Sequence, residues 1–126
     1  MEKTNRGDSN TTIEELKKLV KKFCEERDWD QYHNAKDLAI AISIETSELL
    51  EIFRWKSKNE VKELFQNKIK KENIEDEIAD IFYFLLRFAQ KHNIDLSKTL
   101  RKKLEKNQEK YPVEKFKGSN KKYNEL

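Results

Sequence analysis

The sequence predicts an all-α fold, and three observations lead to that prediction. The 126 residues include two glycines and one proline, too few for the many turns of an all-β domain. The apolar residues gather in blocks with helical spacing, and several blocks begin with residues that cap helices. A chain of this length suggests one domain that leaves much surface exposed. We therefore expect a bundle of about four to five helices, assembled as an oligomer.

The first two helices are expected on either side of a polar connection. Thr12 and Glu15 form a capping-box pattern that opens a helix over residues 12–26, whose apolar residues follow one stripe. Residues 27–34 break that pattern. A second helix over residues 35–55 is apolar nearly all round in its middle, so it is expected to be central or to lie at an interface.

Three more helices are expected in the second half of the chain. A short one begins at the capping box of Ser57 and continues to residue 69, where the polar run KIKKEN links it to a helix over 73–92. The last helix covers residues 95–110 and is stopped by Pro112. The domain prediction follows: a disordered N-terminus over 1–10, a helical domain over 11–112, and a basic tail over 113–126.

Composition narrows the class of protein. The net charge of +3, from 27 basic and 24 acidic residues, makes nucleic acid an unlikely partner. The longest uncharged stretch, residues 38–44, is too short to cross a membrane, and the N-terminus MEKTNRGDSN has no apolar signal core. The single cysteine, Cys24, allows no disulfide within the chain and reads as a core residue. We expect a cytoplasmic protein.

Two pairs of acids lie in the apolar stretches LAIAISIETSELLEIF and EIADIFYFLLRFA: Glu45 with Glu48, and Glu77 with Asp80. The i, i+3 spacing puts both acids of a pair on one helix face. That spacing occurs by chance in a chain with 24 acids, and acids can also edge a helix without a ligand. Acids in apolar surroundings, however, need a partner. The pairs therefore indicate one shared cation site between two neighbouring antiparallel helices.

The chemistry of four carboxylates favours Mg²⁺ as the cation, with Mn²⁺ as the other candidate. Without a partner the carboxylates would repel one another until some became protonated. Oxygen ligands suit Mg²⁺ or Mn²⁺ better than zinc or copper. Because Mg²⁺ is usually held by a few carboxylates together with substrate phosphates, the cluster predicts a phosphate-bearing ligand.

Other kinds of active site are excluded or unsupported. A di-iron carboxylate bundle uses Glu-x-x-His motifs, and neither His33 nor His92 has a glutamate three residues earlier. With two glycines in the chain there is no Gly-rich phosphate-binding loop, so a P-loop enzyme is excluded. Nothing in the chain supports covalent catalysis.

Two tryptophans are candidates for binding a base. Trp55 follows Glu48 by seven residues, so on a continuous helix it would share that face at a distance of about 10.5 Å. This arrangement suits a cation at the phosphates and an aromatic ring at the base. The alternative is that Trp55 and Trp29 are core or interface residues.

The last expected helix carries a polar face of Lys103, Asn107 and Tyr111 at i, i+4 and i+8. A lysine there could neutralise phosphate, and an asparagine could hydrogen-bond to sugar or base. Lys103 could also be an ordinary solvated side chain, and His33 an ordinary surface imidazole.

Beyond these residue patterns, the chain resembles the MazG-like all-α nucleoside triphosphate pyrophosphohydrolases, most closely their dCTP pyrophosphatase branch. The acid pairs, separated by 28 residues, occur in that order in the family. The segments FCEERDWDQYHNAKDLAIAISIETSELLEIFRW, EDEIADIFYFLLRFAQKHNIDL, KLEKNQEKYP and KKYNEL are similar to its successive motifs. The resemblance covers residues 14–126.

The resemblance implies a helical dimer or tetramer that uses Mg²⁺ to hydrolyse a nucleoside triphosphate to the monophosphate and pyrophosphate. By position it implies Glu45, Glu48, Glu77 and Asp80 as metal ligands and catalytic residues. It implies substrate contacts from Trp29, His33, Trp55, Phe84, Lys103, Asn107, Lys121, Lys122 and Tyr123. The last three belong to a tail that reaches a phosphate, in the same or a neighbouring subunit.

Two positions depart from the branch. Phe84 stands where a tyrosine is usual, and the adjacent Tyr83 points about 100° away on a helix. Val20 stands where the first helix usually carries a histidine. Both changes remove hydrogen-bonding groups near the nucleoside, so the preferred base and sugar stay open.

The hypothesis from the sequence is a Mg²⁺-dependent pyrophosphohydrolase acting on a dCTP-like triphosphate in nucleotide-pool sanitation, with one of the acids, Glu48 being a candidate, as the base. A non-catalytic helical oligomer that binds nucleotide or protein through its acidic face is the alternative. A nucleic-acid arm in the basic tail is a third reading.

Overall fold

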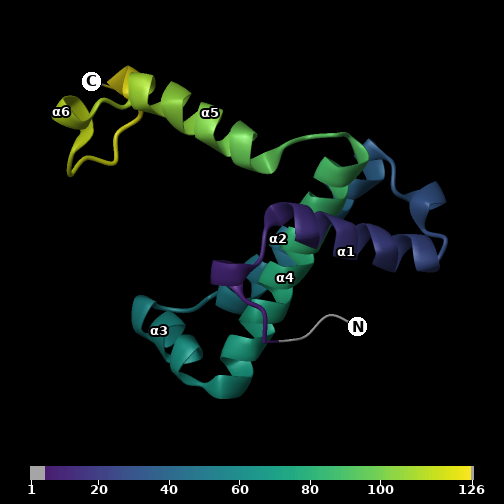
Figure 1. The fold of residues 1–126 in the computed structure, drawn as a ribbon. Coiled ribbons are helices and arrows are strands. Elements are labelled where there is room, and N and C mark those ends of the chain that lie inside the picture. Colours follow the sequence, from purple (N-terminus) through teal and green to yellow (C-terminus); the bar gives the residue numbers. More distant parts are fainter. Residues whose placement is uncertain (1–4, 126) are drawn as a thin grey trace. The chain divides into compact units, whose positions relative to one another are not determined.

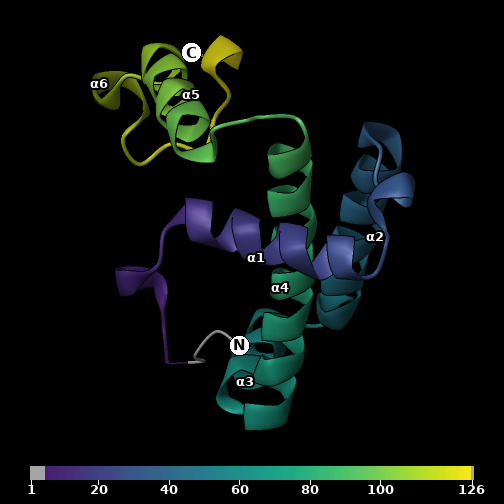
Figure 2. The ribbon, with the colours of Figure 1, turned by 45° about the vertical axis from the view of Figure 1, so that its right-hand side comes forward.

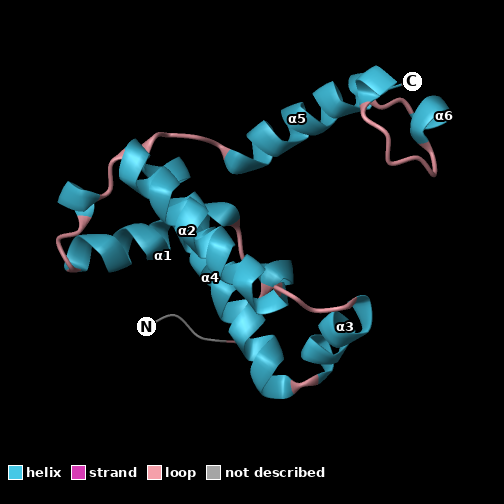
Figure 3. Cartoon of the chain, turned by 180° about the vertical axis from the view of Figure 1, so that it is seen from behind, coloured by secondary structure: helices cyan, strands magenta, loops and turns pink. Residues whose placement is uncertain are grey.

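The computed structural model describes residues 5–125, and every regular element within them is a helix (Figures 1 and 3). The all-α prediction is confirmed. The chain forms two compact units, Met1–Asn93 and Ile94–Leu126, which are described separately. Among the described residues, none of the helices combines the length and the apolar composition needed to span a bilayer.

The first unit contains four long helices: α1 (Ile13–Glu26), α2 (Ala35–Phe53), α3 (Lys58–Gln66) and α4 (Lys68–Lys91). Each begins at a polar side chain that accepts a hydrogen bond from a backbone N–H of the first turn. The expected caps are present: Thr12 accepts from the N–H of Glu15 at 3.1 Å, and Ser57 forms the complete capping box with Glu60.

Helix α4 is the centre of this unit. Helices α2 and α4 lie side by side with opposite chain directions, α1 crosses α4, and α3 joins the lower ends of α2 and α4 (Figure 2). The buried hydrophobic side chains are few and come from all four helices: Cys24, Leu38, Leu64, Ile74, Leu86 and Ala89. Packing of the two predicted acidic helices against each other therefore positions the acid pairs.

One boundary differs from the sequence-based expectation. The run KIKKEN is not a polar link, because α4 already begins at Lys68. Asn67 ends α3 and caps α4 in one residue, since its side chain accepts a hydrogen bond from the N–H of Lys70 at 3.0 Å. The short helix consequently ends at Gln66 rather than at residue 69.

The connection between α1 and α2 is ordered by its own hydrogen bonds. Asp28 adopts a left-handed conformation with φ of 55°, which turns the chain after α1. The N–H of Trp29 then donates to the carbonyl of Cys24 at 3.0 Å, and a 3₁₀ helix follows at Asp30–Tyr32. This segment, residues 28–33, therefore has a defined path.

The second unit consists of α5 (Leu96–Lys110), capped by Asp95 as expected, α6 (Val113–Phe116) and a 3₁₀ turn at Tyr123–Glu125. None of its described side chains is buried. In the first unit, ahead of α1, a 3₁₀ turn occupies Asp8–Asn10. Residues 1–4 of the expected disordered segment lie outside the described residues. The division into domains stays a prediction.

The small core leads to a stability prediction. Replacing the buried Ile74 with alanine should lower the free energy of unfolding by about 2–5 kcal/mol, because it removes methyl groups and leaves a cavity beside α4. The matched control is Ile69→Ala on the same helix, where the side chain is exposed and the loss should stay below about 1 kcal/mol. Urea unfolding measures both; equal losses would contradict the assignment of Ile74 to the core.

Candidate metal centre

Three carboxylates from the two packed helices converge. Glu45 and Glu48 project from α2 and Glu77 from α4, and one oxygen of each lies within 4.8 Å of the others. We call these residues the acid cluster. The i, i+3 spacing on α2 brings the first two together, and the packing of α2 on α4 adds the third. This arrangement brings together three of the four acids that the sequence predicts for a shared site.

The acid cluster contains two oxygens without partners. Oε2 of Glu45 and Oε2 of Glu77 are buried, and neither has a hydrogen-bond partner within residues 5–125. Leaving such an atom unsatisfied costs free energy, so native proteins rarely do it. A divalent cation held between them would satisfy both oxygens together. Carboxylate oxygens are the kind of ligand that hard divalent cations prefer. The residues present fit Mg²⁺ or Mn²⁺.

The pKa values of two of these acids are raised. Burial raises the pKa of Glu45 to about 7, with further contributions from Glu48, Asp80 and Glu77. Burial also raises the pKa of Glu77, followed by the effect of Glu48. Two carboxylates can share a hydrogen bond only when one is protonated, so without a cation the cluster favours holding a proton. A site that must lose this proton to bind metal binds metal better at higher pH.

Asp80, the fourth acid of the predicted site, lies outside the acid cluster. Its side chain is exposed, and none of its oxygens belongs to the three-carboxylate group. Its negative charge nevertheless raises the pKa of both Glu45 and Glu77, so it lies close to them. Its role as a ligand stays a prediction.

Trp29 and His33, the first two predicted nucleoside contacts, are neighbours on the segment between α1 and α2. Their rings meet edge-on with centroids 6.3 Å apart, and the ring of Trp29 also meets that of Phe23 at 5.8 Å. Trp29 is partly exposed, so the indole is supported from α1 and remains accessible.

The hydroxyl of Tyr83 points toward α1. It lies 3.0 Å from Sγ of the buried Cys24, and burial together with this contact raises the pKa of the phenol. The rings of Tyr83 and Phe84 pack edge-on, with centroids 4.9 Å apart. Tyr83 therefore does not replace the hydroxyl missing at residue 84. It lines an apolar cavity of about 240 Å³ with Leu19, Val20 and Phe23.

Trp55 does not continue the helix face of Glu48, so that prediction is wrong. Helix α2 ends at Phe53, and Trp55 adopts a left-handed conformation with φ of 63°, so helical periodicity does not extend to it. The side chain is 87% exposed, with the guanidinium of Arg54 over its ring at 5.0 Å. A role for Trp55 in nucleoside binding stays a prediction without that geometric support.

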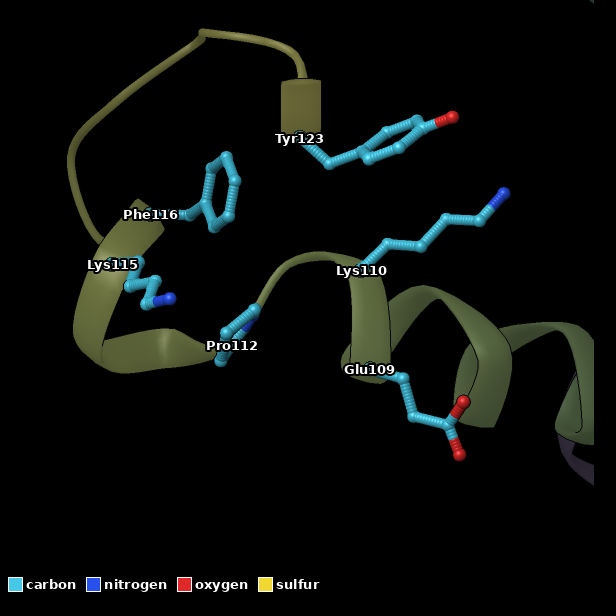
Figure 4. A pocket seen from close by; sticks show the side chains of 6 residues that line it. All are labelled: Glu109, Lys110, Pro112, Lys115, Phe116 and Tyr123. Carbon is cyan, nitrogen blue, oxygen red and sulfur yellow. The ribbon is translucent and has the colours of Figure 1, made fainter. Parts of the chain in front are cut away.

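The remaining predicted substrate contacts belong to the second unit. Lys103 and Asn107 lie on α5, Lys103 exposed and Asn107 half-buried, and Lys121 and Lys122 are exposed. Tyr123 helps line a cavity of about 430 Å³ at the end of α5, with other lining residues labelled in Figure 4. The ammonium of Lys110 lies over the Tyr123 ring at 5.2 Å.

Sequence reasoning missed Arg87. Its side chain is 1% exposed on α4 and contacts Asp30 and His33 on the segment between α1 and α2. A signal was present, because Arg87 interrupts the same apolar run as Asp80 and calls for a partner by the same reasoning.

Comparisons with known proteins identify the relatives of this chain. The profile of the MazG-like family matches residues 40–126. The chain is 32% identical to dCTP pyrophosphatase 1 of Rattus norvegicus over 115 residues, which cover 91% of this chain and 68% of that protein. It is 30% identical to dCTP pyrophosphatase 1 of Homo sapiens, again over 91% of this chain and 68% of that protein. The crystal structure of a pyrophosphatase from Archaeoglobus fulgidus is similar with a TM-score of 0.74 and 37% identity, covering 88% of this chain and 99% of that one.

The raised pKa values lead to a prediction for the metal-free protein. The folded state holds a proton on Glu45 up to a pKa of about 7, whereas the ordinary value is 4.5, so the folded state binds more protons between these pH values. The resulting stability is present at low pH and is lost as the pH rises through about 7. In EDTA, the Tm of the wild type should therefore fall from about pH 5 to 8 more than that of Glu45→Gln.

Divalent cations should reverse this loss. Mg²⁺ or Mn²⁺ should raise the Tm of the wild type, and more at about pH 8 than at pH 6, because the ion competes with the proton. Glu45→Gln should respond less. If neither Mg²⁺ nor Mn²⁺ changes the Tm at pH 8, the acid cluster is not a metal site.

Proposed function

The chain belongs to the MazG-like family, in the branch of the dCTP pyrophosphatases, and we propose that it hydrolyses a dCTP-like nucleoside triphosphate with Mg²⁺ or Mn²⁺. It is a hydrolase of the nucleoside triphosphate pyrophosphatase class. The products are the nucleoside monophosphate and pyrophosphate. The observation that carries the metal dependence is the pair of buried, unpartnered oxygens of Glu45 and Glu77 in an all-carboxylate cluster.

In the proposed reaction, a water oxygen bonds to the α-phosphorus while the bond from that phosphorus to the bridging oxygen breaks. The electron pair of that bond leaves with pyrophosphate. A carboxylate of the site takes the proton that the water loses, with Glu48 as a candidate because its side chain is exposed to solvent. When bound to Glu45, Glu48 and Glu77, a divalent cation supplies positive charge that offsets the charge of the leaving group and lowers the pKa of water. Asp80 adds negative charge that favours cation binding.

We assign binding of the nucleoside half of the substrate to the aromatic residues of the segment between α1 and α2. Trp29 offers a partly exposed indole face to a base, and His33 beside it offers a ring nitrogen. Phe84 and Val20 add no hydrogen-bonding group. We therefore expect weak discrimination between bases, with dCTP as one of several accepted triphosphates. Phosphate and sugar contacts from Lys103, Asn107, Lys121, Lys122 and Tyr123 complete the proposal.

We also propose that the enzyme is a homo-oligomer, a dimer or a tetramer. Large apolar side chains remain exposed on the two central helices, among them Ile40 and Leu50 on α2 and Ile78 and Leu85 on α4. A domain with so small a buried core is marginal as a monomer. A second copy is the partner that can cover such a surface in every molecule.

The activity prediction tests the acid cluster directly. Incubation with dCTP and Mg²⁺ should yield dCMP and pyrophosphate. Glu48→Gln should lower kcat by at least about 100-fold, because mutating a residue that only supports a metal ligand already lowers activity by about 10- to 100-fold. Glu51→Gln, one turn further along α2 on an exposed glutamate, is the matched control and should retain activity. Anion chromatography identifies the products, and circular dichroism checks the fold. If every canonical and modified triphosphate survives intact, the proposed activity is wrong.

The oligomer prediction concerns α2. Sedimentation equilibrium should give a mass that is a multiple of the 15.2 kDa chain. Ile40→Glu should weaken association by about ten-fold or more, because it buries an unpaired charge in the interface. Lys36→Glu on the same helix changes the charge without removing apolar surface and should leave the mass unchanged. A wild type that sediments as a monomer at all concentrations would contradict the proposal.

A further inference from the structure

Arg87 is the only charged side chain buried in the described part of the chain. Burying a guanidinium is costly unless its donors are used. Arg87 uses three: Nε donates to Nδ1 of His33 at 3.0 Å, one terminal nitrogen donates to Oδ1 of Asp30 at 2.9 Å, and the other donates to Oε1 of Gln90. Two of these three partners lie on the segment between α1 and α2.

The contact with His33 determines where the imidazole carries its proton. A guanidinium has donors and no acceptor, and it stays charged at all relevant pH values. Nδ1 of His33 must therefore be unprotonated to accept from Nε of Arg87. The neutral imidazole then carries its proton on Nε2, which has no protein partner within residues 5–125. His33 presents a fixed donor.

The charged groups around His33 support the neutral form. Burial lowers the pKa of His33, and the positive charges of Arg87 and then Lys91 lower it further, against the opposing effect of Asp30. At neutral pH the side chain is thus a neutral donor with its orientation defined by Arg87.

Arg87 and Lys91 supply the polar side-chain contacts between α4 and the 28–33 segment. Lys91, one turn later on α4, pairs with Oδ1 of Asp30 at 2.9 Å and donates to the carbonyl oxygen of the same residue at 3.2 Å. Lys91 therefore holds the backbone at Asp30, whereas Arg87 donates to the ring of His33.

We propose that Arg87 is a positioning residue for nucleotide binding: it fixes His33 as the Nε2–H tautomer, beside Trp29, to donate to an acceptor on the nucleoside half of the substrate. This inference rests on the proposed function. Arg87 acts through His33 and leaves the acid cluster untouched, so its loss affects substrate binding more than the chemical step.

Nuclear magnetic resonance of ¹⁵N-labelled protein tests the tautomer without any substrate. In the wild type at about pH 8, where the imidazole is neutral, the ring of His33 should show protonated Nε2 and unprotonated Nδ1. Arg87→Met fills the same space without a donor, so the tautomers should mix and the pKa of His33 should rise. Asp30 keeps Lys91 as its partner in this variant, which favours folding. His92, the second histidine of the chain, is the internal reference and should not change.

Kinetics then test the role in binding. Arg87→Met should raise KM for dCTP by roughly ten-fold, as expected for one lost oriented hydrogen bond, with kcat changed less than about two-fold. Arg87→Lys keeps the charge and loses the fork of donors, so it should resemble Arg87→Met. His33→Phe should match the KM of Arg87→Met, and the double variant should be no worse than either single variant. Arg101→Met, an exposed arginine on α5, is the matched control.

Three results would overturn the inference: a wild-type His33 protonated on Nδ1, a loss in kcat with KM unchanged, or additive effects of the two single variants. If the wild type turns over no triphosphate, the proposed function fails independently. The same variants are then compared by calorimetric binding of dCMP, where equal affinity of wild type and Arg87→Met would overturn the role of Arg87 as well.

Discussion

The packing of α2 against α4 is the contact on which the site depends. It brings carboxylates of the acid cluster within 4.8 Å of one another, although like charges in a partly buried setting repel. The helices cannot relieve this repulsion by separating, because Leu38 of α2 and Ile74 of α4 are buried in the same small core. The apolar contacts thus maintain an electrostatically unfavourable arrangement, which the proposed divalent cation would make favourable. This is how a hydrophobic core can pre-organise a charged site.

Local patterns predicted most of the fold, and the errors occur where two local signals compete or where the chain turns. Thr12 and Ser57 cap helices as expected, because a cap needs only residues within one turn. The helix expected over 73–92 begins already at Lys68, because Asn67 both ends α3 and caps α4. Trp55 was placed on a helix face because nothing local marks the end of α2 at Phe53. Its left-handed backbone is a property of the turn into α3.

The residues of the site also fall into those that local patterns predict and those that only the folded structure identifies. Acids in apolar runs are visible in a sequence, so the acid cluster could be predicted from α2 and α4 alone. The separate position of Asp80 could not, because it depends on the rotation of α4 against α2. Arg87 interrupts an apolar run just as visibly, but its partners Asp30 and His33 are more than fifty residues earlier in the chain. No periodicity connects residues at that separation, so only the folded structure identifies them.

The contact between Cys24 and Tyr83 has a practical consequence. Cys24 is the sole cysteine of the chain, its side chain is fully buried, and it lies where α1 crosses α4. A thiol reagent can reach it only when α1 separates from α4, so the rate of alkylation in native conditions measures how often that opening occurs. The protein thus carries a built-in chemical reporter of local unfolding, positioned next to the apolar cavity and requiring no engineered label.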